Sequence, residues 1–474
     1  MTDPILERDA VAECLSLVAE EAASYLGSID EALVRPPGAA AGLDGGLPAE
    51  GVGSLAALRA LVEGAQAGAT RSTGPRFFHF VMGGGTPAAL GADCLTSALD
   101  QSAFNWVSSP FALGLEQVSI GWLKELFGLP AEWSGVLTTG ATMANFTGLA
   151  AGRRWWGLRQ GVDIEEEGLS GLPAVPVLAS GHVHASAIKS LAMLGIGRRQ
   201  VRTFAAGEVG NLDADALRRA LEELGGAPAI LVGTAGDVNA GGFDPIDLMA
   251  DLAEEHGAWL HVDGAFGLFA AVSPVTRELV AGIERAHSVA ADGHKWLNVP
   301  YDCGAAFVRD PEIHHGAFTA VAAYLGREEL DRPVFGNLGP EMSRRARALV
   351  VWATLKAYGS EGYRAMVERH VGLARRLADQ VDAQVGLERL AEVPLNVVCF
   401  RYRPEGVPEE ELDELNQRLG EAVLEDGRVY FGTTVYGGKV AFRPAIVNWR
   451  TEAEDVDLIV PLVLELGASL ASRA

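Results

Sequence analysis

Two short apolar segments of the chain end in side chains that can do chemistry together. Trp259–Val262 leads into Asp263, and Ser288–Ala291 is followed by His294 and Lys295. A lysine amine can form an imine with the aldehyde of pyridoxal 5′-phosphate (PLP), and a carboxylate can keep the pyridine nitrogen protonated so that the ring takes up electrons. Asp263 and Lys295 therefore indicate PLP as the cofactor.

Each of these side chains also has an ordinary structural explanation. Asp263 could cap the turn after its strand, and Lys295 could be a surface lysine beside Trp296. Burying a lysine is costly unless its charge is neutralised, and an imine achieves this. His261 alternates with Asp263 along the strand, but a structural histidine explains it more simply than a ligand does.

A turn of small residues could hold the phosphate of such a cofactor. Thr138–Asn145 leads from a strand into a helix, and the first turn of a helix offers free N–H groups and a partial positive charge. Gly140 lets the backbone approach closely, and Thr142 adds a hydroxyl donor. The same residues also fit an ordinary turn between a strand and a helix.

A histidine at the start of a further helix could contact the cofactor ring. His184 follows a strand and could stack on the ring, and with His182 it forms an H-x-H pair. No third ligand stands at a fitting spacing, so we predict no metal site.

Aromatic segments and one arginine are the candidates for binding a substrate. Phe77, Phe80 and Trp106 could line an apolar pocket, although core packing at a domain or subunit boundary is the favoured explanation for any one of them alone. Arg443 could hold a substrate carboxylate through its planar guanidinium group, or it could pair with one of many acidic neighbours.

The composition excludes several kinds of partner. The 474 residues carry a net charge of −24, which argues against nucleic acid and anionic membrane surfaces. No uninterrupted apolar stretch is long enough to span a membrane. The four cysteines are far apart and form no CxxC pair, which is typical of reduced thiols in a cytoplasmic protein.

The elements that must position these residues follow an alternating pattern of strands and helices. We expect strands at Gly135–Thr138, Val175–Ala179, Ala229–Gly233, Trp259–Val262, Ser288–Ala291 and Ala305–Val308. We expect helices between them at Ala141–Arg154, Ala185–Leu194, Asp213–Leu224 and Pro245–His256. This pattern predicts an α/β fold with a mostly parallel sheet, in which ligands bind at the carboxyl ends of the strands.

Three regions are expected along the chain. Residues 1–75 form a helical arm with helices at about 5–33 and 55–63, too small to have a core of its own. Residues 76–350 form the large domain. Residues 351–474 form a smaller α/β domain, preceded by a long helix from about Ser343 to Tyr358 that Gly359 stops.

With these residues assembled, the chain resembles the group II PLP-dependent decarboxylases, which include the aromatic-amino-acid and glutamate decarboxylases, from about Gly74 to the C-terminus. The resemblance is carried by Gly74–Phe78, Phe104–Pro110 with Glu116, Thr139–Asn145, His184–Ser186, His261–Asp263 and Asp292–Trp296. It implies the aspartate-aminotransferase fold (fold type I).

The resemblance assigns roles to particular residues. Lys295 would carry the internal aldimine, Asp263 would pair with the pyridine nitrogen, and His184 would stack on the ring. The remaining cofactor contacts would come from Gly140, Ala141, Thr142 and His294 around the phosphate and from Thr234 and Ala265 at the ring. Arg443 falls near the substrate carboxylate. The family is usually homodimeric with the site at the subunit interface, so the arm would embrace the partner.

One departure from the family concerns the product. Family decarboxylases carry a tyrosine on a loop after the lysine motif, and it protonates the carbanion left by CO2. Arg327–Met342 contains no tyrosine, and Val334 or Phe335 stands near that position, with Tyr324 just before. A phenylalanine there goes with oxidative deamination to an aldehyde.

The leading hypothesis is therefore decarboxylation of an L-amino acid, with an aromatic or bulky apolar side chain favoured. An aldehyde-forming or transamination-like reaction, or another PLP-dependent lyase reaction, is the alternative.

Overall fold

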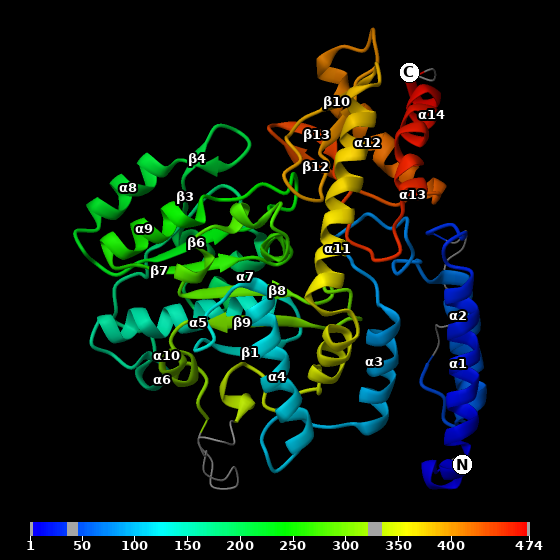
Figure 1. Ribbon diagram of the computed structural model, residues 1–474, viewed down its shortest axis with the longest axis horizontal. Coiled ribbons are helices and arrows are strands. Elements are labelled where there is room, and N and C mark those ends of the chain that lie inside the picture. Colours follow the sequence, from blue (N-terminus) through cyan, green and yellow to red (C-terminus); the bar gives the residue numbers. More distant parts are fainter. Residues whose placement is uncertain (1–2, 36–45, 321–333, 472–474) are drawn as a thin grey trace.

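The computed structural model describes residues 3–35, 46–320 and 334–471 (Figure 1). A seven-stranded sheet with helices on both faces occupies one end of the molecule, and a four-stranded sheet lies at the other. The strands of the large sheet are β1 (Ser134–Thr138), β2 (Val177–Ala179), β3 (Val201–Thr203), β6 (Ile230–Thr234), β7 (Trp259–Asp263), β8 (Ser288–Asp292) and β9 (Gly304–Val308). A two-stranded ribbon, β4 (Ala205–Ala206) with β5 (Asn211–Leu212), extends beside it.

The large sheet is mostly parallel, as predicted. Its strand order is β1-β9-β8-β7-β6-β2-β3, and β9 alone runs against both of its neighbours. Residues of β6 to β9 are buried along their whole length, as is typical of strands covered on both faces. All six expected strands are present, and β3 is an additional edge strand.

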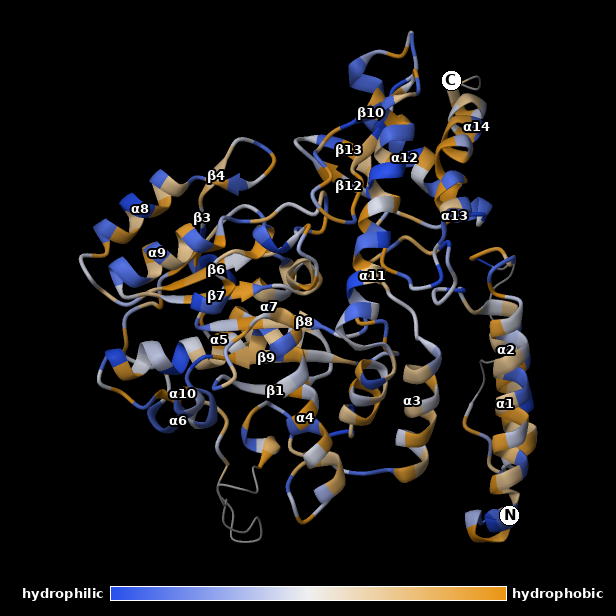
Figure 2. Ribbon diagram, viewed as in Figure 1, coloured by the Kyte–Doolittle hydropathy of each residue, from blue (hydrophilic) through white to orange (hydrophobic). Residues whose placement is uncertain are grey.

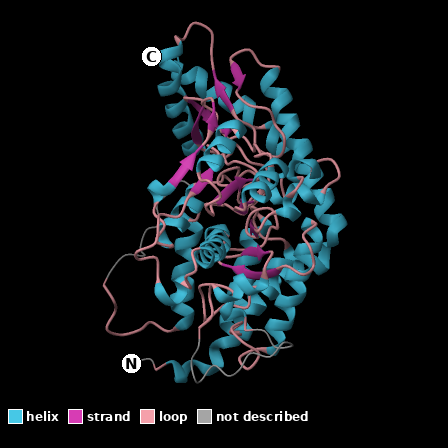
Figure 3. Cartoon of the chain, turned by 90° about the vertical axis from the view of Figure 1, so that its left-hand side faces the viewer, coloured by secondary structure: helices cyan, strands magenta, loops and turns pink. Residues whose placement is uncertain are grey.

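The helices around this sheet lie on both of its faces (Figure 3). They are α4 (Pro110–Phe127), α5 (Ala141–Arg159), α6 (Ile164–Glu167), α7 (Ala185–Met193), α8 (Ala214–Glu223), α9 (Ile246–His256) and α10 (Pro311–Gly316). Helix α3 (Pro87–Leu99) instead packs against the long helix α11 (Ala348–Asp382). The short 3-10 helices are η2 (Arg198–Gln200), η3 (Gly267–Val272), η4 (Arg277–Val280), η5 (Ile283–Arg285) and η6 (Phe335–Asn337). The sequence analysis did not identify α3 and α4. Both begin with a hydroxyl cap followed by proline, Thr86-Pro87 and Ser109-Pro110, which is a recognisable start signal.

A long helix, α11 (Ala348–Asp382), connects the two sheets. Its backbone is interrupted at Gly359, where φ is 62°, so the predicted stop at this glycine is a break within a longer helical segment. The predicted start at Ser343 was wrong by five residues. Arg344 and Arg345 precede the helix because Arg344 joins a buried ion pair and Arg345 forms a bridge with Ser102.

The smaller sheet has its own apolar core. Its order is β10 (Leu387–Arg389), β11 (Phe400–Tyr402), β13 (Lys439–Phe442) and β12 (Thr433–Tyr436), all antiparallel. The helices α12 (Glu409–Asp426), α13 (Ala453–Asp457) and α14 (Ile459–Ala471) accompany it. Phe400, Phe431 and Phe442 are fully buried in this core and pack edge to face.

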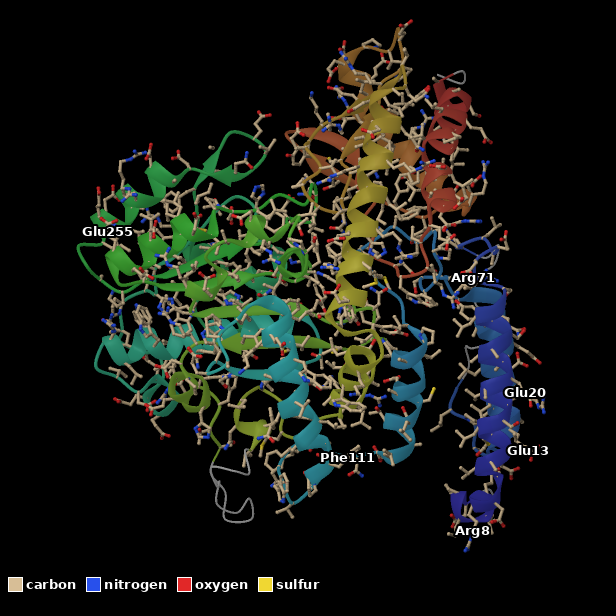
Figure 4. The ribbon with its side chains drawn as sticks, in the orientation of Figure 1. Arg8, Glu13, Glu20, Arg71, Phe111 and Glu255 are labelled. Carbon is tan, nitrogen blue, oxygen red and sulfur yellow. The ribbon has the colours of Figure 1, made fainter. Side chains whose placement is uncertain are left out.

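The N-terminal helices stand apart from both sheets (Figures 1 and 3). They are η1 (Pro4–Ala10), α1 (Val11–Gly27) and α2 (Ser54–Gly68), so the helix expected over residues 5–33 is shorter. No residue of α1 is buried, and Leu15 is 59% exposed. The ribbon of these helices carries many hydrophobic positions, coloured orange in Figure 2, and the side chains of Arg8, Glu13 and Glu20 project from this region in Figure 4.

Among the described helices, none combines the length and apolar character needed to cross a bilayer.

Candidate active site

The functional residues predicted from the sequence meet at one edge of the large sheet. Strands β1, β6, β7 and β8 run in the same direction, so their carboxyl ends lie together. In the register of β6 and β7, Thr234 lies directly opposite Asp263.

A cavity of about 190 Å³ lies at this edge. Its walls include all nine predicted cofactor-binding residues: Gly140, Ala141, Thr142, His184, Thr234, Asp263, Ala265, His294 and Lys295. The other wall residues were not predicted individually as site residues, although the first two belong to the predicted phosphate-binding turn: Thr139, Met143, His182, Ser186, Gly236, Asp237, Val238, Phe266 and Asp292. Most of these residues are next to a predicted residue in the sequence, so their position near the end of a strand was the signal that could have identified them.

Lys295 reaches into the cavity from the turn after β8. Its side chain is 18% exposed, and its Nζ lies 3.8 Å from Asp292 Oδ2. The ammonium group also lies 5.7 Å from the centre of the Phe266 ring. A mostly enclosed amine beside a carboxylate can exchange its proton locally, which a nucleophilic lysine requires.

Asp263 is held by neutral donors. It is 4% exposed, its Oδ1 accepts a hydrogen bond from Ala265 N at 3.1 Å, and its Oδ2 accepts one from Asn145 Nδ2 at 2.8 Å. Among the described residues, no cation forms an ion pair with it. A buried carboxylate that is held only by neutral donors favours a bound ligand with a cationic group.

The turn before α5 provides an anion site. Gly140 has φ 144°, a conformation that favours glycine, and a Cβ there would lie 2.8 Å from His294 Cε1. The backbone N–H groups of Ala141, Thr142 and Met143 open the 19-residue helix α5. Their unpaired donors and the helix dipole suit a phosphate group.

His294 closes this side of the cavity. Its Nδ1 accepts a hydrogen bond from Cys303 N at 3.3 Å, so its proton is on Nε2, 2.9 Å from Asp292 Oδ1. The ring stacks on Tyr301 with centres 4.0 Å apart. These contacts fix the plane of the imidazole next to Gly140.

His184 lies on another wall of the cavity, at the N-terminus of α7. Its Nδ1 accepts hydrogen bonds from Ser186 N at 3.2 Å and from Ser186 Oγ at 2.7 Å. Burial lowers the pKa of His184, and the charge of Asp263 opposes that shift. The imidazole is therefore oriented through Nδ1 and carries its proton on Nε2.

The four predicted substrate residues do not line this cavity in the single chain. Phe77 is buried and stacks on Tyr430, while Phe80 is 58% exposed. Trp106 packs against the buried cluster that contains Phe335. Arg443 comes closest, because its Nη1 donates to the carbonyl of Val238, a residue of the cavity wall, at 3.3 Å.

The donor set of the cavity fits PLP. Thr234 Oγ1 is buried and has no hydrogen-bond partner within the described chain, although it borders the cavity. The glycine turn offers N–H groups to a phosphate, Asp263 offers a carboxylate to a protonated ring nitrogen, and Lys295 offers an amine. No group of three or more potential metal ligands occurs among the described residues.

Comparison with known proteins identifies the family. Residues 61–403 match the pyridoxal-dependent decarboxylase conserved domain. The chain is 30% identical over 393 residues to an aromatic-L-amino-acid decarboxylase of Bacillus atrophaeus, covering 81% of this chain and 79% of the relative. The chain belongs to the PLP-dependent decarboxylases, and it is a carboxy-lyase that acts on amino acids with PLP as cofactor.

Solved structures agree with this assignment. A crystal structure of Oryza sativa TDC with PLP and tryptamine superimposes with a TM-score of 0.90 at 26% identity, covering 99% of this chain and 100% of that one. A Rhodiola rosea 4-hydroxyphenylacetaldehyde synthase superimposes with a TM-score of 0.87 at 25% identity, covering 98% and 99%. The fold is therefore that of fold type I PLP enzymes.

Proposed function

We propose that the chain decarboxylates an L-amino acid with an aromatic or bulky apolar side chain, using Lys295 to carry the cofactor. The observation that carries this proposal is the placement of Lys295, Asp263 and the Gly140 turn around one cavity. The relative and the neighbouring structure whose names refer to aromatic amines and amino acids support the side-chain preference.

PLP bound in this cavity supplies an aldehyde for the substrate amine and a ring that takes up the electron pair released as CO2 leaves. Asp263 would hold the proton of the ring nitrogen, and Ala265 and Thr234 would lie at the ring. The N–H groups at Gly140, Ala141 and Thr142, together with His294, would hold the phosphate. His184 would lie against the ring.

Arg443 is the residue that we propose for the substrate carboxylate. No described acidic residue forms an ion pair with it, and burial lowers the pKa of its guanidinium despite the opposing charge of Asp237. A partly buried cation without an ion-pair partner is ready to accept a carboxylate in bidentate geometry.

The apolar part of the pocket is completed, in this proposal, at a homodimer interface. Phe80 and Trp106 lie outside the cavity of their own chain and are not buried, so we assign them to the pocket at that interface, whereas Phe77 is buried against Tyr430 in its own chain. The exposed apolar side chains Ile5, Leu6, Val11, Leu15 and Val18 on the arm support a second copy as its partner. We also propose division at residues 75 and 350 into arm, large domain and small domain. Four free cysteines support a cytoplasmic location.

An aldehyde product is the second candidate. Val334 and Phe335 are 9% and 4% exposed, so the residues at the expected tyrosine position are packed into the core, and residues 334–342 include no tyrosine. Tyr324 falls outside the described residues. The resemblance to an aldehyde synthase structure also favours this outcome.

A panel of L-amino acids tests the proposal. Purified protein with PLP is incubated with aromatic, aliphatic, acidic and basic L-amino acids, and CO2, amine, aldehyde and hydrogen peroxide are measured together. CO2 and amine from aromatic substrates support the main proposal, and aldehyde with peroxide supports the second. CO2 from acidic or basic substrates alone would contradict the proposed side-chain preference.

A further inference from the structure

A continuous chain of buried hydrogen bonds runs beneath the cavity to Asp263. Trp259 Nε1 lies 3.0 Å from Ser288 Oγ, which lies 2.8 Å from His261 Nδ1. His261 Nε2 lies 2.9 Å from Asn145 Oδ1, and Asn145 Nδ2 donates to Asp263 Oδ2 at 2.8 Å. The first four residues are at most 1% exposed, so solvent does not replace any of these bonds.

All of these hydrogen bonds donate in the same direction, from Trp259 toward Asp263. The indole N–H of Trp259 can only donate, and both carboxylate oxygens of Asp263 accept hydrogen bonds from neutral N–H groups. Asn145 must therefore turn its NH2 group toward Asp263 and its oxygen toward His261, which donates from Nε2. Burial lowers the pKa of His261 to about 4, so the ring is neutral near pH 7 and its Nδ1 accepts from the hydroxyl of Ser288. Every group then has a partner.

The hydroxyl proton of Ser288 has one competing acceptor. The carbonyl oxygen of Gly148 lies 3.3 Å from Ser288 Oγ, compared with 2.8 Å for His261 Nδ1. The shorter contact is the stronger one, so the direction toward His261 is preferred.

The amide of Asn145 also serves a second branch. Its Nδ2 donates to Ser186 Oγ at 3.2 Å, and Ser186 Oγ lies 2.7 Å from His184 Nδ1. Because the backbone N–H of Ser186 also points at His184 Nδ1, that nitrogen carries no proton. One amide group is thus hydrogen-bonded to Asp263 directly and to His184 through Ser186.

We propose that Asn145 is a positioning residue that fixes the orientation of the Asp263 carboxylate and keeps His184 oriented with its proton on Nε2, so that both side chains meet the cofactor in the required geometry. This inference rests on the proposed roles of Asp263 and His184. The donation from Asn145 leaves the other lone pairs of the carboxylate for the ring nitrogen. The hydrogen bonds that lead back to Trp259 keep the amide group of Asn145 from flipping, because a flipped amide would place its oxygen next to the carboxylate of Asp263.

Removing the amide should weaken cofactor binding and change its titration. In Asn145→Ala, the loss of a hydrogen bond to a charged group corresponds to a roughly 10- to 100-fold larger dissociation constant for PLP. The pH at which the visible absorption of bound PLP changes should also move, because the carboxylate that faces the ring nitrogen then has one hydrogen-bond donor fewer. The titratable groups facing Asp263 and His184 are His261, Lys295 and Arg443, and all three are unchanged in this variant.

A matched control separates this role from packing. Thr147 lies on the same helix, is fully buried and donates only to the carbonyl of Met143 at 2.8 Å. Thr147→Ala should lower the thermal unfolding temperature of the PLP-free protein without moving the absorption titration. An unchanged titration in Asn145→Ala, or an equal shift in Thr147→Ala, overturns the inference.

A second variant covers the case in which Asn145→Ala does not fold. Ser288→Ala removes the hydroxyl that fixes His261, three hydrogen bonds away from Asp263, and should move the titration in the same direction by less. No shift in this variant overturns the inference. If the wild-type protein with PLP shows no visible band that borohydride removes, the proposed function fails instead, so the two failures are distinguishable.

Discussion

Removing one partner of the buried ion pair between Glu116 and Arg344 should strongly destabilise the protein. The side chains are 1% and 2% exposed, and Arg344 Nη2 lies 2.6 Å from Glu116 Oε1. A buried charge left without its partner costs about 3–5 kcal/mol of unfolding free energy, so we expect this loss in Glu116→Leu and in Arg344→Met. The double variant removes both charges, so its loss of unfolding free energy should be smaller than the sum of the losses in the two single variants.

The coupling free energy between Glu116 and Arg344 is the difference between the loss in the double variant and the summed losses in the two single variants. Its size depends on the other hydrogen bonds that the pair makes. Arg344 donates to the carbonyls of Ala103 at 2.8 Å and Leu137 at 2.7 Å, and Glu116 accepts from Leu137 N at 3.0 Å. Three backbone groups therefore lose partners in the double variant, so it should still lose about 3 kcal/mol of unfolding free energy. The two single variants together should lose about 6–10 kcal/mol, which leaves a coupling free energy of about 3 kcal/mol or more.

Urea unfolding of the PLP-free protein, followed by tryptophan fluorescence, measures all four members of this cycle. The control cycle uses Arg218 and Glu255, an exposed pair whose Nη1 and Oε2 atoms lie 3.0 Å apart, with an expected coupling free energy of about 0.2–1 kcal/mol. Glu255 is labelled at the outer edge of the molecule in Figure 4. Additive single changes at Glu116 and Arg344 would refute the reasoning.

Three further predictions follow from the site and its surroundings. Gly140→Ala should weaken PLP binding by at least about tenfold, because strain at φ 144° and contact with His294 each cost about 1–2 kcal/mol. Equilibrium dialysis measures the dissociation constant of PLP, and a wild-type value in this variant would contradict the prediction. Arg443→Lys should raise the KM for the amino acid with little change in PLP affinity, since a lysine cannot bind a carboxylate in bidentate fashion. An unchanged KM would argue against the proposed contact between Arg443 and the substrate carboxylate. Burial lowers the pKa of His370 from 6.5 to about 3, so the unfolded state binds the extra proton between these values and stability is lost as pH falls below about 6.5. His370→Gln should make the pH dependence of the unfolding free energy shallower by about 1.4 kcal/mol per pH unit in that range, and an identical slope would show that the histidine titrates normally.

The strand ends of the site could be predicted because they depend on local pattern. Apolar runs such as Trp259–Val262 identify buried strands, and parallel strands bring their carboxyl ends to one edge. Asp263 and Lys295 could therefore be placed near each other from the sequence. The substrate residues could not, because whether Phe80 or Trp106 reaches a cavity depends on packing between distant segments.

The hydrogen-bond chain below the cavity was also beyond sequence reasoning. Asn145 lies in an apolar helix and His261 in an apolar strand, and each alone fits a structural role. Only the packing of α5 against β7 and β8 brings the amide within reach of both the imidazole and Asp263. Polar residues within otherwise apolar elements were the one available signal, since buried polar groups need partners.

Borohydride reduction of the protein with bound PLP tests the central claim most directly. Reduction converts an imine between PLP and a lysine into a stable bond, and digestion followed by mass spectrometry locates the modified residue. We predict that the cofactor mass is found on the peptide that contains Lys295 and that Lys295→Ala shows none. A label on another lysine, or no label in the wild-type protein, would contradict the assignment of Lys295 as the residue that carries the cofactor.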